Sequence, residues 1–425
     1  MRARCAQTAA SRSRSAAAGS GPSSAARAIP TASTSRRRSR RPASSALNAG
    51  RASSCAGVAG AARCSTVASG TQSAPSPHAS FPRRPPQGKT PPEAGPVKAR
   101  PVTENEERYW DRLVRETARP HLLQSTGWAQ VKAATGWRAE RFVLEDDGGR
   151  RGCVQVLRKR VAPSLSVAYA PRGPLCEDER LPDAVSALRK ELARDWTVSL
   201  LIDPEVPDSE PLARALEAAG VRRSPVYVQP RRTLLMDLSQ EPDAMLATMR
   251  KKTRQYIHKA ERAGVATEET TDLARFHRLL TTVAERDRFG IHDLDYFADL
   301  VEAFGDSLHL LLARIDGEDA GALLVIRIGD RAWELFGGWS GTHGESRPFY
   351  LLKWRSMLRM KQLGVRRYDM WGLAEGDELA GVENFKLGFG GEVATWIGAL
   401  ETPVTGFLFP LWRLGARKRL AAASA

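Results

Sequence analysis

The strongest constraint on the fold is an internal repeat in the part of the chain that follows residue 103. The first copy is expected to contain, in order, strands at 141–145, 152–160 and 166–170, a helix near 181–194, a strand at 198–202 and a helix at 209–219. The second copy repeats this order, with strands at 308–315, 320–328 and 331–336, a helix at 348–363 and a strand at 366–371. Corresponding points are separated by 166 to 170 residues, as in the pairs Gly152 and Gly321, Tyr169 and Phe336, Asp203 and Asp369, and Gly220 and Gly390. The repeat predicts two tandem copies of one mixed α/β domain, with a chance alignment of short strand patterns as the alternative.

Charge is distributed very unevenly along the 425 residues. The chain has 64 lysine and arginine residues against 48 acidic residues, which gives a formal net charge of +16. Residues 1–100 contain 17 of the basic residues and a single acid, Glu93, so the remaining 325 residues are neutral overall. This balance excludes a generally basic body that coats nucleic acid, although it allows a local basic surface.

Residues 1–103 consist mainly of Ala, Ser, Arg, Pro and Gly and contain almost no large apolar side chains. Such a segment cannot bury enough surface to offset the loss of chain entropy, so we expect a disordered tail. An organelle transit peptide fits the acid-poor composition, and the arginines at 36–41 fit an arm that binds nucleic acid. We favour a third interpretation, an extension without a function of its own, such as one produced by a misassigned translation start.

Cysteine usage and hydropathy indicate a reduced, intracellular protein. Three of the five cysteines lie in the tail, there is no CxxC pair, and the N-terminus lacks the apolar core of a signal peptide. No run of 18 apolar residues occurs, so no transmembrane helix is expected. We expect a cytoplasmic protein without structural zinc, any other bound metal or a cofactor.

A short helix that begins at Ser125 carries the first candidate binding residues. Ser125 is a typical N-cap, and Trp128 and Lys132 lie four residues apart on one face of the helix. An indole beside a cation suits a sugar or a nucleotide diphosphate. The alternative is a core tryptophan with a lysine whose stem runs along it to solvent.

The second candidate is a strongly basic helix, expected from about Asp243 to Ala263 and ended by Gly264. Its buried stripe should contain Leu246, Met249, Thr253, Ile257 and Ala260. Arg250, Arg254 and His258 recur at every fourth residue on another face, where they are suited to charge-assisted contacts with phosphates. A merely solvated face is the alternative.

Two further candidates lie near the C-terminus. In the segment 385–391 the double glycine predicts a tight turn that places Lys386 near the central strands of the second copy, where a cation would stabilise an oxyanion. A purely structural turn is the alternative. The apolar and aromatic segment 407–414, followed by the basic residues 417–419, would lie at a membrane surface or pack against the body.

The repeated unit resembles the GNAT acyltransferase fold, which opens two central strands to admit an acyl donor. Ordinary GNAT enzymes bind the pyrophosphate of coenzyme A with the backbone of an [R/Q]-x-x-G-x-[G/A] loop. Neither copy contains this loop. The first copy has Arg172 in the segment 170–176, and the second has Trp339 in the glycine-rich segment 337–344. This absence argues against a coenzyme A donor.

Six segments, taken in order, carry a closer resemblance. They are Leu123–Lys132, Ala168–Pro174, Val228–Leu234, Met249–Ala260, Tyr368–Gly372 and Asn384–Gly391. Together they are similar to the FemABX family, aminoacyl-tRNA-dependent transferases that build peptidoglycan cross-bridges and contain two tandem GNAT-like domains. The resemblance runs over about 104–400 and fits the short form that lacks a coiled-coil arm. The 103-residue tail has no counterpart in the family.

The resemblance implies an organisation and a reaction. The expected parts are a disordered tail at 1–103, a GNAT-like domain on the acceptor side at 104–240, a GNAT-like domain with the basic helix on the tRNA and acyl side at 241–402, and an aromatic and basic extension at 403–425. The donor would be aminoacyl-tRNA, and the acceptor would be the stem-peptide amine of UDP-MurNAc-pentapeptide or lipid II. We expect a monomer that makes peripheral contact with the inner face of the membrane.

Roles for individual residues follow from the same resemblance. Lys132 matches a lysine that contacts the diphosphate of the acceptor, and we take Arg254 as its companion. Phe385 and Lys386 match a pair near the tRNA acceptor end and the developing oxyanion, and are the catalytic candidates. The remaining candidates for substrate binding are Trp128, Arg172, Tyr256 and Trp339.

The resemblance identifies no general base, and Asp369, Glu375 and Glu383 are the candidates from the second copy. Positioning of two large anionic substrates would supply much of the rate. Two other functions compete with this one. The first is a GNAT-type N-acyltransferase that uses acyl-CoA. The second is an RNA- or membrane-binding protein with a degenerate GNAT pair, which would need only the basic helix and the tail.

Overall fold

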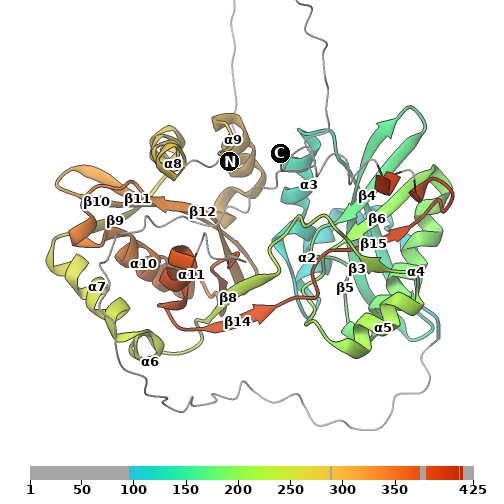
Figure 1. The fold of residues 1–425 in the computed structure, drawn as a ribbon, viewed down its shortest axis with the longest axis horizontal. Helices are drawn as coiled ribbons and strands as arrows, with labels where there is room; N and C mark the ends of the chain where they lie inside the picture. The colour runs from blue at the N-terminus through green and yellow to red at the C-terminus, as the bar shows by residue number, and fades with distance from the viewer. Residues whose placement is uncertain (1–94, 288–289, 374–379, 411, 415–425) are drawn as a thin grey trace, which may run out of the picture. The chain divides into compact units, whose positions relative to one another are not determined.

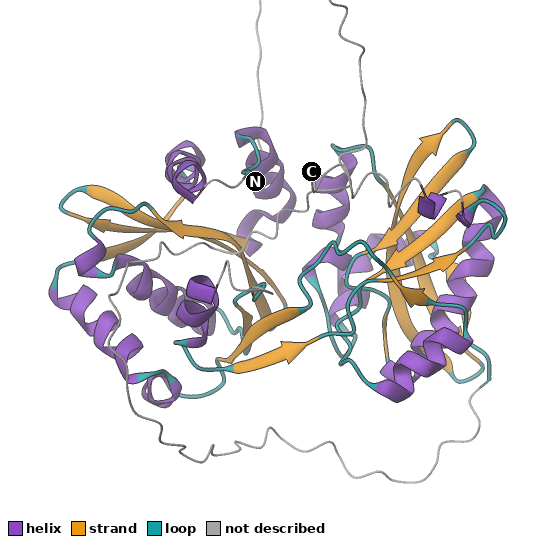
Figure 2. Cartoon of the chain, in the orientation of Figure 1, coloured by secondary structure: helices purple, strands orange, loops and turns teal. Residues whose placement is uncertain are grey.

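The computed structural model describes residues 95–287, 290–373, 380–410 and 412–414. Within these residues the chain forms two mixed β-sheets, each covered by helices (Figures 1 and 2). Most of the predicted tail lies outside the described residues, as do Glu375 and the basic residues 417–419.

The first sheet combines strands from both ends of the described chain, in the order β1-β2-β3-β4-β6-β15-β7, with β5 paired to β3. Its strands are β1 (Lys98–Pro101), β2 (Arg138–Asp146), β3 (Gly149–Ala162), β4 (Leu165–Ala170), β5 (Leu175–Cys176), β6 (Thr197–Ile202), β7 (Arg222–Arg223) and β15 (Leu400–Pro403). β4 and β6 are parallel, and every other neighbouring pair is antiparallel.

The second sheet has the order β14-β8-β13-β12-β11-β10-β9. Its strands are β8 (Arg232–Asp237), β9 (Ala266–Thr270), β10 (Leu308–Ile315), β11 (Glu318–Ile328), β12 (Arg331–Trp339), β13 (Arg367–Asp369) and β14 (Glu392–Thr395). From β9 to β14, all neighbouring strands are antiparallel except β12 and β13, which are parallel. The first sheet, followed from β1 to β7, has its parallel pair at the same place. The expected order of strands and helices therefore occurs twice.

Most of the helices that cover the sheets do so through buried apolar side chains. Those of the first part are α1 (Glu104–Arg108), α2 (Trp110–Arg115), α3 (Thr126–Ala133), α4 (Leu181–Leu192) and α5 (Glu210–Ala218). Those of the second part are α6 (Pro242–Thr248), α7 (Lys251–Arg262), α8 (Leu273–Asp287), α9 (Leu294–Phe304), α10 (Pro348–Gln362) and α11 (Ala380–Leu387). Successive residues of a strand point to opposite faces, so Leu310 and Leu312 pack with α8 and α9, while Leu311 packs with α7 and α10. Figure 1 shows α8 and α9 on one side of this sheet and α7 and α10 on the other.

Three strands that the sequence analysis did not predict depart from the expected division of the chain into domains. β1 falls within the range expected to be tail and pairs with β2. β8 precedes residue 241 yet belongs to the second sheet, and β15 begins within the range 241–402 expected for the second domain yet belongs to the first sheet. The chain therefore crosses between the sheets before β8 and again before β15. A strand of four to six residues carries no signal for the sheet it will join, because pairing depends on tertiary placement.

The basic helix predicted from about Asp243 to Ala263 is in fact two helices. α6 ends at Thr248 and α7 begins at Lys251, because Met249 and Arg250 adopt extended backbone conformations. Met249 is buried in the core at this break, and the Arg250 N–H donates to the Gly388 carbonyl at 2.9 Å. Packing of α7 against the segment after α11 therefore competes successfully with helix continuation.

Candidate active site

The second sheet opens between its two central strands. β12 and β13 pair only from Arg331 with Arg367 to Trp333 with Asp369, and β12 then continues alone to Trp339 on this side. In the first sheet the corresponding strands stay paired to Ala170 and Ile202, where both strands end. Of the two described sheets, the second is therefore the one that opens between its parallel strands.

A small cavity lies at this opening. It is lined by Leu323, Glu334, Phe336, Gly337, Phe349, Lys353, Met370 and Lys386. Glu334 on β12 forms a buried ion pair with Lys353 of α10 and accepts a hydrogen bond of 2.7 Å from the Tyr368 hydroxyl. The cavity thus has apolar walls and two buried ammonium groups, one of which is neutralised by a carboxylate.

Lys386 reaches this cavity from a helix, whereas the sequence predicted a turn. α11 carries Phe385 and Lys386, and the predicted turn begins only at Gly388. Gly390 and Gly391 have φ values of +80° and +81°, which lead the chain from α11 into β14 and require glycine. The position of Lys386 is therefore fixed by a helix that the glycines end.

The Lys386 side chain is buried where it borders this cavity. Its Nζ donates hydrogen bonds of 2.7 Å to the carbonyls of both Trp371 and Gly372, and its side chain is 1% exposed. Burial, together with the nearby charge of Lys353, lowers the pKa of Lys386 to about 7. A lysine held in this way supplies a fixed N–H donor whose charge changes near neutral pH.

Phe385 belongs to a line of aromatic rings that runs from the cavity to α7. Phe385 stacks on Phe349 with centroids 5.6 Å apart, and Tyr350 meets its edge at 4.8 Å. Tyr350 in turn contacts Tyr256 of α7 at 4.9 Å. The structure therefore brings together three of the predicted residues, Tyr256, Phe385 and Lys386.

A bulge in β12 directs Phe336 toward a second group of candidate residues. Leu324 pairs with Phe336 and Val325 with Glu334, which leaves Leu335 as an extra residue. The alternation of side chains shifts at this point, so Phe336 packs on the α9 side although it also lines the cavity. Its ring lies 6.1 Å from that of His292 and 6.3 Å from that of Tyr296.

This second group surrounds Lys132, where α3 packs against α9. The Lys132 ammonium lies 4.5 Å from the ring centre of Trp128 and 5.6 Å from that of Tyr296, and His292 stacks on Tyr296 at 3.9 Å. Burial and the charge of Lys159 lower the pKa of Lys132 to about 8, and burial and Lys132 lower that of His292. The sequence analysis did not single out His292 and Tyr296. The only signal that could have indicated them is their spacing of four residues at the start of α9.

Arg254 lies elsewhere. Its Nη1 donates to the carbonyls of Met249 at 2.5 Å and Ala247 at 3.4 Å, so the guanidinium caps the end of α6. α7 covers the face of the second sheet opposite to the one that α9 covers (Figure 1). The structure therefore does not bring Arg254 and Lys132 together around one diphosphate.

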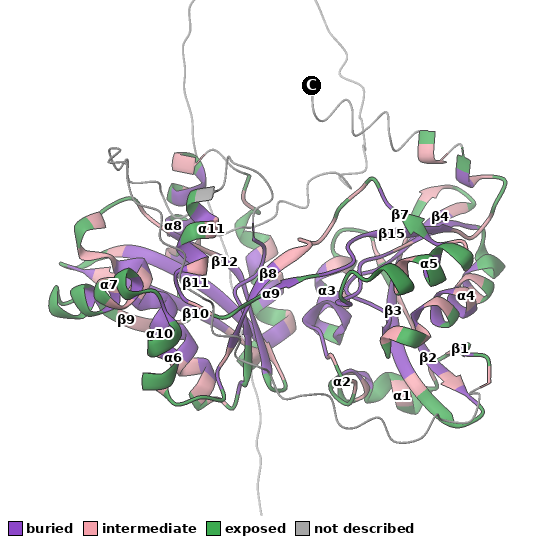
Figure 3. Cartoon of the chain, turned by 60° about the horizontal axis from the view of Figure 1, so that its bottom comes forward, coloured by how far each residue is buried: buried purple, intermediate pink, exposed green. Residues whose placement is uncertain are grey.

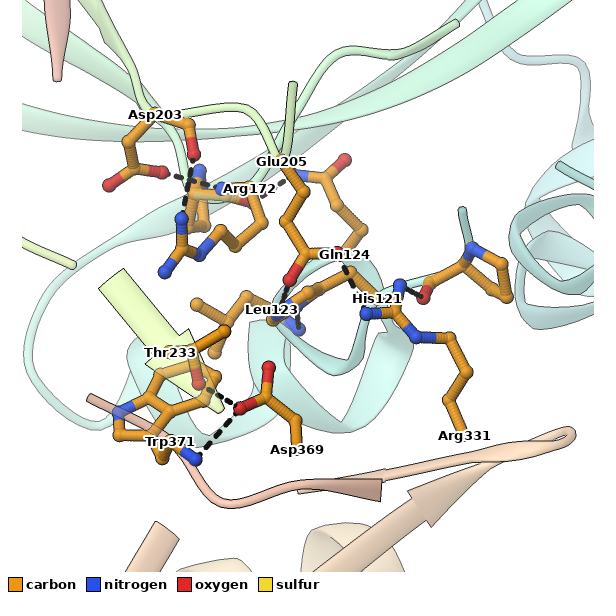
Figure 4. A network of polar contacts seen from close by, with 12 residues as sticks. His121, Leu123, Gln124, Arg172, Asp203, Glu205, Thr233, Arg331, Asp369 and Trp371 are labelled. Carbon is orange, nitrogen blue, oxygen red and sulfur yellow. Dashed lines mark hydrogen bonds and ion pairs between the residues drawn. The ribbon is translucent and has the colours of Figure 1, made fainter. Parts of the chain in front are cut away.

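A buried polar network connects the two sheets (Figure 4). Arg331 at the start of β12 donates to Glu205 at 2.8 Å and to the Pro120 carbonyl at 2.8 Å. Burial acts to raise the pKa of Glu205, but the charge of Arg331 prevails and lowers it to about 2. His121 accepts from the Leu123 N–H through Nδ1, and burial lowers its pKa well below the usual range, so its ring is neutral.

Two aspartates occupy equivalent places in this network (Figure 4). Asp203 follows β6 and accepts from the Arg172 N–H at 2.6 Å, and Asp369 ends β13 and accepts from the Trp371 N–H at 2.7 Å. Burial raises the pKa of each to about 6. The Arg172 side chain donates to the Pro230 carbonyl at 2.8 Å, so it links segments of the chain.

The other predicted residues stand apart from both groups. Trp339 lies at the end of β12, where its indole donates to the Thr342 carbonyl at 2.6 Å and Arg286 lies 5.2 Å from its ring centre. Glu383 pairs with Arg232 at 2.9 Å. Among the described residues, no cluster of three or more His, Cys, Asp or Glu side chains is arranged to hold a metal ion.

Comparison with known proteins identifies the family to which this chain belongs. The family model described as "FemAB family" matches residues 105–217, 210–320 and 318–416, which together span nearly all of the described chain. The chain belongs to the FemAB family. The resemblance seen in the six sequence segments is thereby confirmed, as is the prediction of two tandem GNAT-like domains of mixed α/β class.

Two curated relatives share the name "Lipid II:glycine glycyltransferase". The protein of Staphylococcus aureus strain COL is 31% identical over 229 residues, and that of strain MRSA252 is 30% identical over the same length. In each case the match covers 49% of this chain and 54% of the relative, so the chain spans about half the length of the curated relatives it matches.

The crystal structure of FemX superposes with a TM-score of 0.67 at 20% sequence identity, over 74% of this chain and all of that chain. This similarity concerns the fold. Within the described residues, no helix combines the length and the apolar character that a membrane span needs.

Proposed function

We propose that the protein is an aminoacyltransferase that moves an amino acid from aminoacyl-tRNA to the stem-peptide amine of UDP-MurNAc-pentapeptide or lipid II. Membership of the FemAB family and the names of the curated relatives support this reaction class. The observation that carries the proposal is the position of Phe336, which lines the cavity of Lys386 and packs against His292 and Tyr296, beside Lys132. Two polar sites of different chemistry thus lie on either side of one strand.

We assign the cavity to the donor ester. The acceptor amine attacks the ester carbonyl, the new amide bond forms, and the 3′-oxygen of the tRNA leaves with a proton. A tetrahedral intermediate carries a negative oxygen between these steps. The Lys386 ammonium has three N–H donors, and two are used by the carbonyls of Trp371 and Gly372. The third is available to the oxyanion, in surroundings where a charge-assisted hydrogen bond is strong.

We assign the group around Lys132 to the acceptor. The ammonium beside the rings of Trp128 and Tyr296 offers a cation for a diphosphate and apolar faces for a sugar or a base. His292 takes the place beside Lys132 that the resemblance gave to Arg254. The acceptor would then lie between α3 and α9, and the donor would lie on the other side of β12.

An exposed aromatic pair supports contact with a membrane that carries lipid II. Trp196 is 55% exposed and Phe407 is 70% exposed, and their rings meet edge to face at 6.4 Å. Exposed rings of this kind favour the membrane–water interface. We therefore propose a peripheral protein that meets the membrane on this side of the first sheet.

The experiment that tests the proposal follows a labelled amino acid. Full-length protein is incubated with a mixture of radiolabelled aminoacyl-tRNAs and with UDP-MurNAc-pentapeptide or lipid II in vesicles. We expect label on the acceptor, lost when the tRNA is first digested with RNase. Acylation of the same acceptor from acetyl-CoA without tRNA would replace this proposal with the acyl-CoA alternative.

A further inference from the structure

The exposed side of α7 carries positive charge that the described structure does not neutralise. Arg250, Lys251, Lys252, Lys259 and Arg262 are all exposed, and much of α7 is green in Figure 3. Among the described residues, the ion pairs on this helix involve one acid, Glu261, which is shared by His258 and Arg355. Five cations thus lie within about three turns of helix without an acidic partner in that part of the chain.

An aromatic residue lies close to two cations on the same side. The Tyr256 ring lies 4.4 Å from the Arg347 guanidinium and 5.7 Å from the Lys252 ammonium. Its side chain is half-buried, so part of the ring borders solvent. Cations beside a partly open ring match the chemistry that binds single-stranded nucleic acid, in which bases stack and phosphates meet cations.

Packed aromatic rings connect this surface to the proposed donor cavity. Tyr256 contacts Tyr350 at 4.9 Å, Tyr350 contacts Phe385 at 4.8 Å, and Phe385 precedes Lys386. The backbone is also coupled, because the Arg250 N–H donates to the Gly388 carbonyl directly after α11. An RNA whose aminoacylated 3′ end occupies the cavity would therefore have its preceding nucleotides beside α7.

We propose that the basic side of α7, with Tyr256 as a stacking platform, is the docking surface for the RNA of the donor next to its aminoacylated 3′ end. The inference rests on the proposed function and adds to it the face on which the donor lies. Because Arg254 and Lys132 lie on opposite faces of the second sheet, the cations of α7 are free of the acceptor. The phosphodiester backbone is the anion that suits a row of cations beside an aromatic ring.

The first test measures binding of uncharged tRNA by fluorescence anisotropy over a series of salt concentrations. The full chain is compared with the variant Lys252→Gln/Lys259→Gln/Arg262→Gln and with a matched control, Arg160→Gln/Lys190→Gln/Arg222→Gln, whose three exposed cations lie on the first sheet and its helices. The slope of log Kd against log salt should decrease by about 2 in the α7 variant and remain unchanged in the control. Both variants keep the basic residues 1–103, so any binding of tRNA by that segment contributes equally to both slopes. Equal slopes in the two variants would therefore overturn the inference.

The second test uses Tyr256. Tyr256→Leu should weaken tRNA binding about tenfold, and Tyr256→Phe, which keeps the ring, should bind as the wild type does. Equal losses in both variants would contradict a stacking role. Thermal unfolding midpoints that match the wild type establish that each variant is folded.

The third test separates this inference from the proposed function. With a charged 3′-terminal trinucleotide as donor, which is too short to cross α7, the triple α7 variant should transfer at the wild-type rate, while its KM for charged tRNA rises about tenfold or more. An unchanged KM for charged tRNA would overturn the docking surface and leave the transferase intact. Absence of transfer by the wild type would refute the proposed function, and the anisotropy result would still decide whether α7 binds RNA. Loss of binding to phosphatidylglycerol vesicles, with RNA binding unaltered, would assign α7 to a membrane and overturn the inference.

Discussion

Replacement of Lys386 by methionine should separate catalysis from stability. Methionine fills a similar volume but removes the ammonium that donates to the carbonyls of Trp371 and Gly372. If Lys386 stabilises the oxyanion, Lys386→Met should lower kcat by about 10²–10³-fold, the usual consequence of removing one such donor. The KM for the acceptor should change little, because Lys132 and its neighbours remain.

The effect on stability follows from two opposing contributions. The lowering of the Lys386 pKa from 10.5 to about 7 means that burial of this ammonium opposes folding by about 5 kcal/mol at neutral pH. Methionine removes that cost but leaves two buried carbonyls unsatisfied, at about 1–3 kcal/mol each. The contributions nearly cancel, so the free energy of unfolding should stay within about 3 kcal/mol of the wild-type value.

Urea unfolding and the transfer assay, applied to the same preparations, measure both quantities. Lys361→Met is the matched control, since Lys361 also donates to a backbone carbonyl, that of Leu238 at 3.0 Å, but lies outside the cavity. It should retain normal turnover. A folded Lys386→Met protein with near-normal kcat would refute the catalytic role, and a variant that unfolds in the absence of urea would refute the reasoning about burial.

The remaining predictions concern pH, the acceptor and the network between the sheets. Because the Lys386 cation is lost as pH rises through about 7, kcat/KM of the wild type should fall above neutral pH. Lys386→Arg stays charged and should move this fall to higher pH. An identical pH profile in the two proteins would exclude Lys386 as the group that titrates. Lys132→Met should raise the KM for the acceptor about 10–100-fold and leave the KM for charged tRNA unchanged, and a rise in both constants would contradict the separation of the two sites. Glu205→Ala should lower the free energy of unfolding by about 3–5 kcal/mol, because Arg331 would remain buried without its partner, and a loss below about 1 kcal/mol in urea unfolding would show that this ion pair is not structural.

Much of the fold could be predicted because the same local sequence patterns occur in both copies of the repeat. Three strands of alternating polarity followed by a helix and a strand need no long-range information to be recognised, and their recurrence at a near-constant separation indicates a duplicated domain. The two parallel pairs, β4 with β6 and β12 with β13, follow from the same order, since parallel neighbours need a crossover helix between them.

The parts that sequence could not predict depend on tertiary contacts. The exchange of β8 and β15 between the sheets arises because short strands have no intrinsic partner. The break between α6 and α7 arises because Met249 is drawn into the core and the Arg250 N–H finds the Gly388 carbonyl. The break does not alter the local sequence pattern that suggested one helix.

The candidate site shows the same division. Lys386 and Phe385 could be singled out because they lie in a short glycine-rich segment that matches a family motif. His292 and Tyr296 could not be singled out, because they join Lys132 only through packing of α3 on α9. Arg254 was chosen for its position on a basic helix, but its guanidinium is directed to the end of α6 by a backbone turn that the sequence does not reveal.

The central claim is tested most directly by mass spectrometry of the acceptor after incubation of the full-length protein with charged tRNA. Our account predicts a product heavier by one aminoacyl residue, joined by an amide to the side-chain amine of the stem peptide, in an amount that depends on intact tRNA. An acceptor of unchanged mass with charged tRNA, both as UDP-MurNAc-pentapeptide and as lipid II in vesicles, together with acetylation by acetyl-CoA, would contradict it.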